Sequence, residues 1–249
     1  MITVFGASDV GRRRSSNQDC FSIVNLSDGS VCAVVCDGMG GAAGGNIAST
    51  LARDTVINQI SASYNEKMND RSIKAMLESA VAAANIAVFD KAVSDSTLAG
   101  MGTTAVVALI RSDTLYIAHV GDSRAYIVSK NVENGISQIT TDHSIVQMMV
   151  ESGQITEEEA RIHPKRNIIT RAIGVSDSVR SDFNIMRLSG GDRLLICSDG
   201  LTNFMQNNII TDIVNENSPK DAVKLLIDGA NDAGGGDNIT AVVAEYAED

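Results

Sequence analysis

The sequence predicts an α+β fold in which helices cover antiparallel β-sheets. Segments with strand patterns occur in clusters, and segments with helical spacing lie between the clusters rather than alternating with single strands. Two strand pairs are joined by turns that suit hairpins, Ser27-Asp28-Gly29-Ser30 and Asn134-Gly135. This order favours antiparallel sheets over a doubly wound parallel sheet. The 249 residues contain no linker or repeat, so we expect one domain spanning residues 1–249.

In the first half of the chain, a short N-terminal strand precedes Gly11. A hairpin of residues 21–25 and 31–36 follows, and then helices over residues 46–61 and 70–93. The second helix is predicted by an apolar stripe at helical spacing, made by Ile73, Leu77, Ala80, Val81, Ala84 and Val88. The next strands are expected at residues 103–110, 114–120, 125–128 and 136–139.

Residues 143–175 interrupt this pattern, and we interpret them as an irregular flap beside a functional site. They hold a short amphipathic helix (144–151), an acidic turn (156–160) and the basic segment His163-Pro164-Lys165-Arg166-Asn167. Regular elements then resume with a strand at 192–197, helices near 207–215 and 219–230, and a last strand at 239–246.

Composition excludes several classes of protein. A net charge of −11 argues against a nucleic-acid partner, because phosphates require a basic surface. Uninterrupted apolar runs, such as residues 103–110, are shorter than the ~18 residues of a membrane span, so we expect no membrane association. Cys32 and Cys36 would lie about 13 Å apart on one strand, too far for a disulfide. These features predict a cytoplasmic protein.

Four aspartates are the most informative residues. Each stands where an apolar strand meets glycine or another small polar residue, and they are Asp37, Asp122, Asp199 and Asp237. Aspartate is unfavourable in strands, and carboxylates that converge repel one another. Hard divalent cations such as Mg²⁺ or Mn²⁺ remove this conflict, because they prefer oxygen ligands. The pattern therefore predicts a metal site.

Each acidic turn also has an ordinary interpretation. Asp37-Gly38 and Asp199-Gly200 could be tight turns before helices, and Asp237 could lie at a loop tip. The segment 121–124 could be a hairpin corner ordered by an ion pair. The glycines after Asp37 could hold nucleotide phosphates, but the dinucleotide and Walker patterns are absent. The occurrence of all four at strand ends favours the metal site.

If the reaction at this metal site is phosphoester hydrolysis, the covalent routes to it find no support in the sequence. A cysteine phosphatase needs arginine six positions after its cysteine, and those positions hold Leu26, Gly38, Ala42 and Asn203. An Asp-x-Asp nucleophile pair is excluded because Met39 follows Asp37 and Leu201 follows Asp199 at that spacing. No Gly-x-Ser-x-Gly motif or His-x-x-x-His zinc pair occurs either. A metal-activated water remains as the nucleophile.

Eight blocks of the sequence, in order, resemble the metal-dependent type 2C (PPM) protein phosphatases, and most closely their compact bacterial serine/threonine members. The blocks are Gly11, Arg14 and Asn17-Gln18-Asp19; Asp37-Gly38-Met39-Gly40-Gly41; Gly102-Thr103-Thr104; Gly121-Asp122-Ser123-Arg124; Thr141-Asp142-His143-Ser144; Ile169-Thr170-Arg171-Ala172-Ile173-Gly174; Ser198-Asp199-Gly200; and Gly236-Asp237-Asn238. The resemblance runs from Ser8 to Val243. It implies a sandwich of two antiparallel sheets flanked by helices, with metals at one edge.

The resemblance also implies roles for individual residues. Asp37 would bridge two Mn²⁺ or Mg²⁺ ions, the Gly38 carbonyl would bind one of them, and Asp199 and Asp237 would complete the pair. Asp122 would share a weaker third ion with Asp199. Arg14 would bind the substrate phosphate. Gln18, Asp19 and Asn238 would surround and position the metal ligands without binding the metals directly.

The implied activity is hydrolysis of phosphoserine and phosphothreonine by in-line attack of a metal-activated water. Two residues depart from the eukaryotic pattern: Gln18 replaces a glutamate, and Met39 replaces a histidine proposed as the general acid. Water on the third metal is then our candidate proton donor. We expect phosphorylated proteins as substrates, a bacterial protein kinase as the opposing enzyme, and a monomer.

Two other functions stay open. The first is a catalytically inactive module that binds phosphoproteins on the same fold, although inactive homologues usually lose a ligand such as Asp37. The second is an enzyme for nucleotides or small phosphomonoesters that uses residues 37–45 to hold phosphate. Manganese-dependent release of phosphate from a phosphothreonine peptide, but not from nucleotides, would separate the three.

Overall fold

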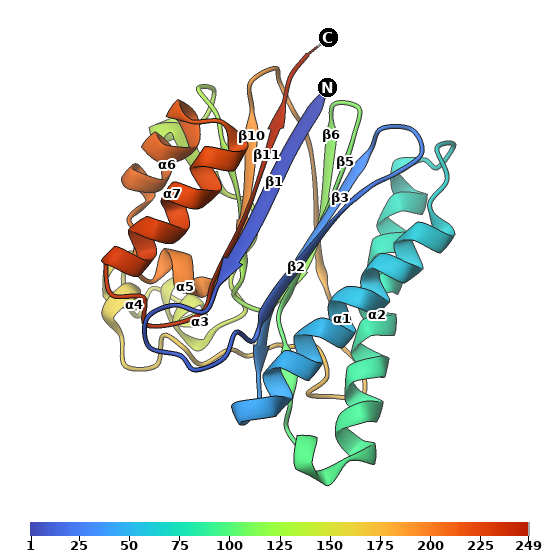
Figure 1. Ribbon diagram of the computed structural model, residues 1–249, viewed down its shortest axis with the longest axis vertical. Coiled ribbons are helices and arrows are strands. Elements are labelled where there is room, and N and C mark those ends of the chain that lie inside the picture. Colours follow the sequence, from blue (N-terminus) through green and yellow to red (C-terminus); the bar gives the residue numbers. More distant parts are fainter. Residues whose placement is uncertain (249) are drawn as a thin grey trace.

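Two antiparallel sheets form the centre of the molecule, and helices lie on both outer sides (Figure 1). The computed structural model describes residues 1–248, without the side chains at positions 42 and 43. The first sheet has the order β1 (Ile2–Asp9), β11 (Ile239–Tyr246), β10 (Arg193–Cys197), β7 (Arg124–Val128) and β8 (Ile136–Gln138). The second has β2 (Asp19–Asn25), β3 (Val31–Met39), β5 (Ala105–Arg111), β6 (Thr114–Val120) and β9 (Asp182–Arg187), with the short β4 (Gly102–Thr103) paired to β3. The predicted sandwich is confirmed.

Three layers of apolar side chains hold the sandwich together. Along β3, Ala33 and Val35 point into the layer between the sheets, and Cys32, Val34 and Cys36 point toward the helices. Side chains alternate between the two faces of a strand, so a strand buried on both faces is apolar throughout. The layer between the sheets combines β3, β5 and β6 with β7, β10 and β11.

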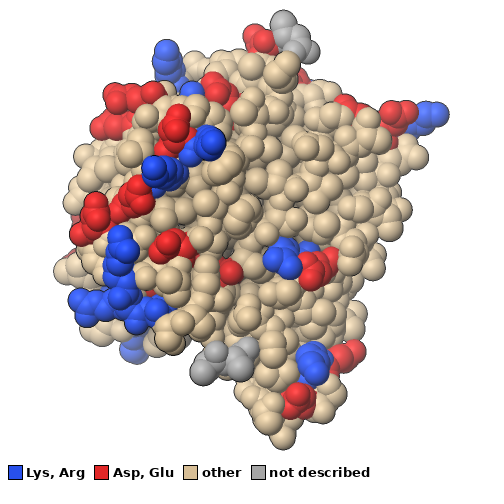
Figure 2. Space-filling view, viewed as in Figure 1, with Lys and Arg blue, Asp and Glu red and all other residues tan. Residues whose placement is uncertain are grey.

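Long helices cover the outer face of each sheet. The helices α1 (Gly41–Ser63) and α2 (Asp70–Ser94) pack on the second sheet, while α6 (Asn207–Glu216), α7 (Pro219–Asp232) and the short α5 (Asp199–Thr202) pack on the first. Local signals set their starts: Asn69 caps α2, and Ser218 caps α7 just before Pro219. In Figure 2, acidic and basic side chains mix over α6 and α7, and the centre of this face carries few charges.

The helix α2 is long and apolar enough, by length and average composition, to cross a membrane. Charged residues such as Lys74 and Glu78 interrupt it, so the sequence shows no uninterrupted apolar run of that length. Every residue of its predicted stripe is at most 1% exposed. The stripe packs against α1 and the second sheet, as expected for a core helix.

The structure corrects several predicted elements. The acidic turn at 156–160 is the start of the helix α4 (Glu157–Ile162), where Thr156 and Glu159 form a capping box. The preceding helix is α3 (Ile145–Glu151). The helix α1 begins at Gly41, five residues earlier than predicted, after Gly40 adopts a left-handed conformation with φ 119°. The Asn134-Gly135 turn lies within a short 3₁₀ segment, Glu133–Gly135.

Three elements were not predicted at all. These are the edge strand β9, the short helix α5, which starts at Asp199, and the 3₁₀ segment Ser96–Leu98. The predicted strand at 103–110 is divided at Thr104 into β4 and β5. Thr104 bonds to the backbone of Asp37 through both its amide and its hydroxyl. This contact positions the end of β3, where the predicted site begins.

Candidate active site

The four aspartates singled out in the sequence line one cavity of about 460 Å³ at the end of the sandwich. Asp37 is near the end of β3, and Asp199 begins α5 immediately after β10 and Ser198. Asp122 lies in the turn after β6, and Asp237 lies just before β11. Neighbouring strands of both sheets end at this place, so residues far apart in the chain meet there. Gly38, Arg14, Gln18 and Asn238 also line the cavity.

The carboxylates strongly oppose one another's ionisation. Burial, followed by the charges of neighbouring aspartates, raises the pKa of Asp37 well above its usual value. Burial and the charge of Asp199 raise the pKa of Asp122 to about 8. The pKa of Asp199 is also raised, by burial and by Asp237. Such a cluster fits hard divalent cations, which would let the carboxylates share one site while ionised.

Asp19 lies behind this cluster, opposite Asp37 in the β2–β3 register. Its Oδ2 accepts hydrogen bonds from the hydroxyls of Ser198 (2.6 Å) and Thr240 (2.7 Å). Its Oδ1 is buried without a hydrogen-bond partner among the described residues. Burial raises its pKa to about 6. An orphaned buried carboxylate oxygen is a costly feature that a bound cation, or the water of its hydration shell, would satisfy.

Gly38 has room for no side chain. An added Cβ would collide with the Gly45 carbonyl, and it would come within 2.7 Å of the Gln18 carbonyl. The amide of Gly38 donates to that Gln18 carbonyl at 3.2 Å. The close approach of these three backbone segments explains why glycine stands directly after Asp37.

The segment between β1 and β2 carries Arg14 to the rim of the cavity. Its side chain is half exposed, and Nη2 donates to Asp237 Oδ2 at 2.7 Å. The buried side chain of Asn238 anchors this segment, because its Oδ1 accepts from the Gln18 amide. Its Nδ2 donates to the carbonyls of Val10 and Ser16. Asn238 therefore positions the loop that presents Arg14.

Several contributing residues were not assigned a role from the sequence. Asn203 Nδ2 donates to Asp199 Oδ2 at 2.9 Å, and the two are one helical turn apart. Thr104 Oγ1 accepts from the Asp37 amide and lies 2.7 Å from Ser123 Oγ. Thr240 is the one polar residue in the first six residues of β11, which is the sequence signal that could have identified it.

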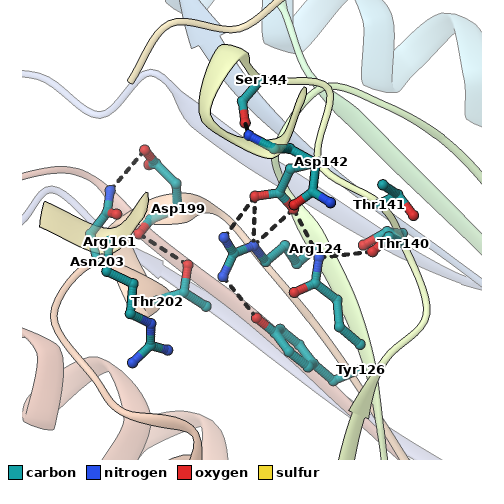
Figure 3. A network of polar contacts seen from close by, with 12 residues as sticks. Arg124, Tyr126, Thr140, Thr141, Asp142, Ser144, Arg161, Asp199, Thr202 and Asn203 are labelled. Carbon is teal, nitrogen blue, oxygen red and sulfur yellow. Dashed lines mark hydrogen bonds and ion pairs between the residues drawn. The ribbon is translucent and has the colours of Figure 1, made fainter. Parts of the chain in front are cut away.

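The hairpin corner at 121–124 is held by an ion pair, but the partner is not Asp122. Figure 3 shows the Arg124 guanidinium against the carboxylate of Asp142, with Nε at 2.9 and 3.0 Å and Nη2 at 2.6 Å. Arg124 Nη1 also donates to the Tyr126 hydroxyl at 3.0 Å. Asp199 and Asn203 lie beside this network (Figure 3). An ion pair therefore orders this turn, as the ordinary interpretation expected, and it is formed by Arg124 and Asp142. Asp122 takes no part in it and lines the cavity.

A second group of possible metal ligands, His119, His143 and Asp182, lies away from the cavity. The Gly121 amide donates to His143 Nδ1 at 3.0 Å, so a neutral ring carries its proton on Nε2. Arg171 Nη1 lies 2.9 Å from that Nε2 and donates to Asp182 at 2.7 Å. A cation already occupies this place, so these residues support the fold near Gly121 rather than a metal.

Comparison with known proteins agrees with this arrangement. A family model described as protein phosphatase 2C matches residues 8–234. The chain is 36% identical over 246 residues to the protein phosphatase PhpP of Streptococcus pneumoniae, covering 97% of this chain and 96% of that protein. The crystal structure of the serine/threonine phosphatase Stp1 from Staphylococcus aureus matches with a TM-score of 0.93 and 35% identity, over 100% of this chain and 96% of that chain. The catalytic domain of the serine/threonine protein phosphatase PstP, crystallised with two manganese ions, matches with a TM-score of 0.83 and 30% identity, over 99% of each chain.

Proposed function

The chain belongs to the protein phosphatase 2C family, and we propose that it hydrolyses phosphoserine and phosphothreonine in other proteins. One observation carries the proposal. Four aspartates from separate strand ends line a single cavity whose rim presents Arg14. This arrangement joins a site for divalent cations to a cation that suits phosphate oxygens.

We propose that Asp37, Asp199, Asp237 and the Gly38 carbonyl hold two Mn²⁺ or Mg²⁺ ions. Asp122, with Asp199, would hold a weaker third ion. The mutual repulsion of these carboxylates and the unpaired oxygen of Asp19 support this assignment. When bound, such ions supply an activated water and neutralise the charge that develops on the phosphoryl group.

The side chains around the cavity bind and orient the substrate. The Arg14 guanidinium would hold two phosphate oxygens in place of its contact with Asp237. Asn238 would keep the Arg14 loop in position through its three backbone contacts. All four cysteines are buried, which supports water as the nucleophile. Met39 lines the cavity but has no proton to donate to the leaving alkoxide.

The biological setting follows from this chemistry. A phosphatase for phosphoserine and phosphothreonine needs a kinase that forms its substrates, so we propose a bacterial protein kinase as the opposing enzyme. The four free cysteines support a reducing cytoplasm. We also propose that the protein is a monomer, which size-exclusion chromatography with light scattering would test.

The decisive experiment measures phosphate release from a phosphothreonine peptide and from nucleotides, with Mn²⁺ and then with excess chelator. We expect hydrolysis of the peptide alone, and only with metal. Asp37→Asn should abolish it, whereas Asp212→Asn, on the exposed side of α6, should leave it unchanged. Peptide binding without turnover would indicate a binding module, and nucleotide turnover would indicate a small-molecule enzyme. Full activity after chelation would exclude the metal-dependent mechanism.

A further inference from the structure

A second, smaller cavity of about 220 Å³ lies beside the cavity of the aspartates, and we call it the side pocket. Met39 and Ile169 line both cavities, so the side pocket and the phosphate-binding cavity share a wall. Met39 is the last residue of β3, and Ile169 belongs to the expected flap. Neither side chain has a role in the hydrolysis proposed above.

Five of the ten residues that line the side pocket are apolar, and the other five are Thr170, Arg171, Ser176, Ser178 and Arg180. Ala172, Val175 and Val179 line it together with Met39 and Ile169. Met39 and Val175 converge over Gly102, where an added Cβ would lie 2.8 Å from Met39 Cε and 2.9 Å from Val175 Cγ2. Val175 is nevertheless 52% exposed. Val175, with the partly exposed Met39 and Ile169, thus forms an apolar surface partly open to water, and the flexible thioether of Met39 can adapt to different occupants.

The position of the side pocket indicates what would fill it. An extended peptide advances about 3.3 Å per residue, so a residue one or two positions from a phosphorylated serine or threonine reaches a neighbouring pocket. The volume is below the roughly 300 to 1,000 Å³ of typical small-molecule sites, and it suits one side chain. Burying an apolar side chain there would remove both surfaces from water.

We propose that the side pocket binds an apolar side chain of the substrate protein, close in sequence to the phosphorylated residue. The proposal rests on the proposed phosphatase function and adds a preference for apolar residues near the target serine or threonine. Arg180 is exposed and also lines the side pocket, as does Arg171, which is paired with Asp182, so an acidic residue is the competing occupant.

Phosphothreonine peptides that differ at one position test the proposal. Leu, Ser, Asp or Lys is placed in turn at each of the two positions on either side of the phosphothreonine, and kcat/KM is measured with Mn²⁺. An aryl phosphate, which has no neighbouring residues, reports the basal activity. We expect Leu to be favoured over Ser about three- to tenfold at one position, because part of a leucine side chain becomes buried.

Two variants complete the test. Val175→Asp should remove the preference for Leu and favour Lys at the same position, with unchanged turnover of the aryl phosphate. Val93→Asp is the matched control, because Val93 is 70% exposed on α2 and does not line the side pocket. It should behave like the unmodified protein.

Equal rates for Leu and Ser at every position would overturn the proposal, as would a Leu preference that survives Val175→Asp. A preference for Asp that disappears in Arg180→Ser would show that the side pocket binds acidic residues, and it would also overturn the proposal. If the aryl phosphate is hydrolysed but no phosphopeptide is, the proposed function fails and the side-pocket proposal fails with it.

Discussion

Asp37 is half-buried at the cavity and faces the carboxylates of Asp19, Asp122, Asp199 and Asp237, which disfavour its charge. Burying an unpaired carboxylate costs stability. The Thr104 hydroxyl and the backbone around Gly38 hold it in place regardless. At the residue scale, the carboxylates of the site repel one another, and the rest of the fold holds them together. Such an unfavourable arrangement is expected where a ligand binds.

Arg14→Ala should weaken the binding of phosphorylated substrate while leaving the metals in place. Loss of one charge-assisted bidentate contact suggests about 1.5 to 3 kcal/mol in kcat/KM. Metal affinity should not fall, because Arg14 contacts Asp237 and its removal frees that carboxylate. Kinetics on a phosphopeptide and calorimetry with Mn²⁺ measure the two effects. Arg13→Ala serves as the control. Unchanged kinetics with lost metal affinity in Arg14→Ala would contradict the assignment of Arg14 to phosphate binding.

Asp122→Ala should separate two classes of substrate. Asp37, Asp199 and Asp237 remain, so two tightly bound cations should still be measurable by calorimetry. An alkoxide leaving group depends on a proton more than an aryl oxide does, so activity on phosphoserine peptide should fall much more than activity on aryl phosphate. The Arg124–Asp142 ion pair should persist, since it does not involve Asp122. Equal loss on both substrates, or loss of the tight sites, would give Asp122 a different role.

At the scale of elements, the loop between β1 and β2 depends on a residue more than 200 positions away. The Asn238 side chain satisfies the Gln18 amide and two carbonyls of this loop. Asn238→Ala should therefore cost about 1 to 3 kcal/mol in the free energy of unfolding, because Asn238 is buried and three part-buried backbone groups lose their partner. It should also raise KM for phosphopeptide, because Arg14 loses its position.

Chemical denaturation and steady-state kinetics test this prediction. Asn217→Ala is the matched control: its side chain donates to the Ile213 carbonyl at the end of α6, far from the loop. It should change stability slightly and leave KM unchanged. A stable Asn238→Ala variant with normal KM would show that the loop holds Arg14 by itself.

At the scale of the whole molecule, stability should fall with rising pH more steeply without metal than with it. The folded-state pKa values of Asp19 (about 6) and Asp122 (about 8) lie above the ordinary 3.8. Their contribution is therefore fully present at low pH and is lost as pH rises through these values. Burial lowers the pKa of His119 and His143, so their contribution is lost only as pH falls below about 6.5. Between pH 6.5 and 8, the carboxylates dominate.

The melting temperature of the metal-free protein should accordingly decrease from pH 6.5 to pH 8. Saturating Mg²⁺ should raise it at both values, and more at pH 8, because the cations bind the ionised carboxylates of the folded state. Thermal unfolding with chelator and with Mg²⁺ provides the comparison. Asp122→Asn should reduce the metal-free slope. A melting temperature that does not change with Mg²⁺ would argue against metal binding by the aspartates of the cavity.

The sequence alone determined the elements whose signals are local. The stripe of α2 and the last strand, residues 239–246, were predicted well, because repeated burial on one helix face or both strand faces leaves a clear pattern. The partly exposed edge strand β9 was missed, since it carries little of that pattern. The positions of the four aspartates at strand ends were also visible, because a carboxylate interrupts an apolar run wherever it occurs.

How these local segments meet is visible in the folded structure alone. The division of a predicted strand at Thr104, the pairing of Arg124 with Asp142, and the hydrogen bond between Asn238 and the Gln18 amide all join separate segments. The wall that Met39 and Ile169 share between two cavities is of the same kind. Such contacts depend on packing between sheets and loops, and the order of residues along the chain carries no local signal of which distant groups will be brought together.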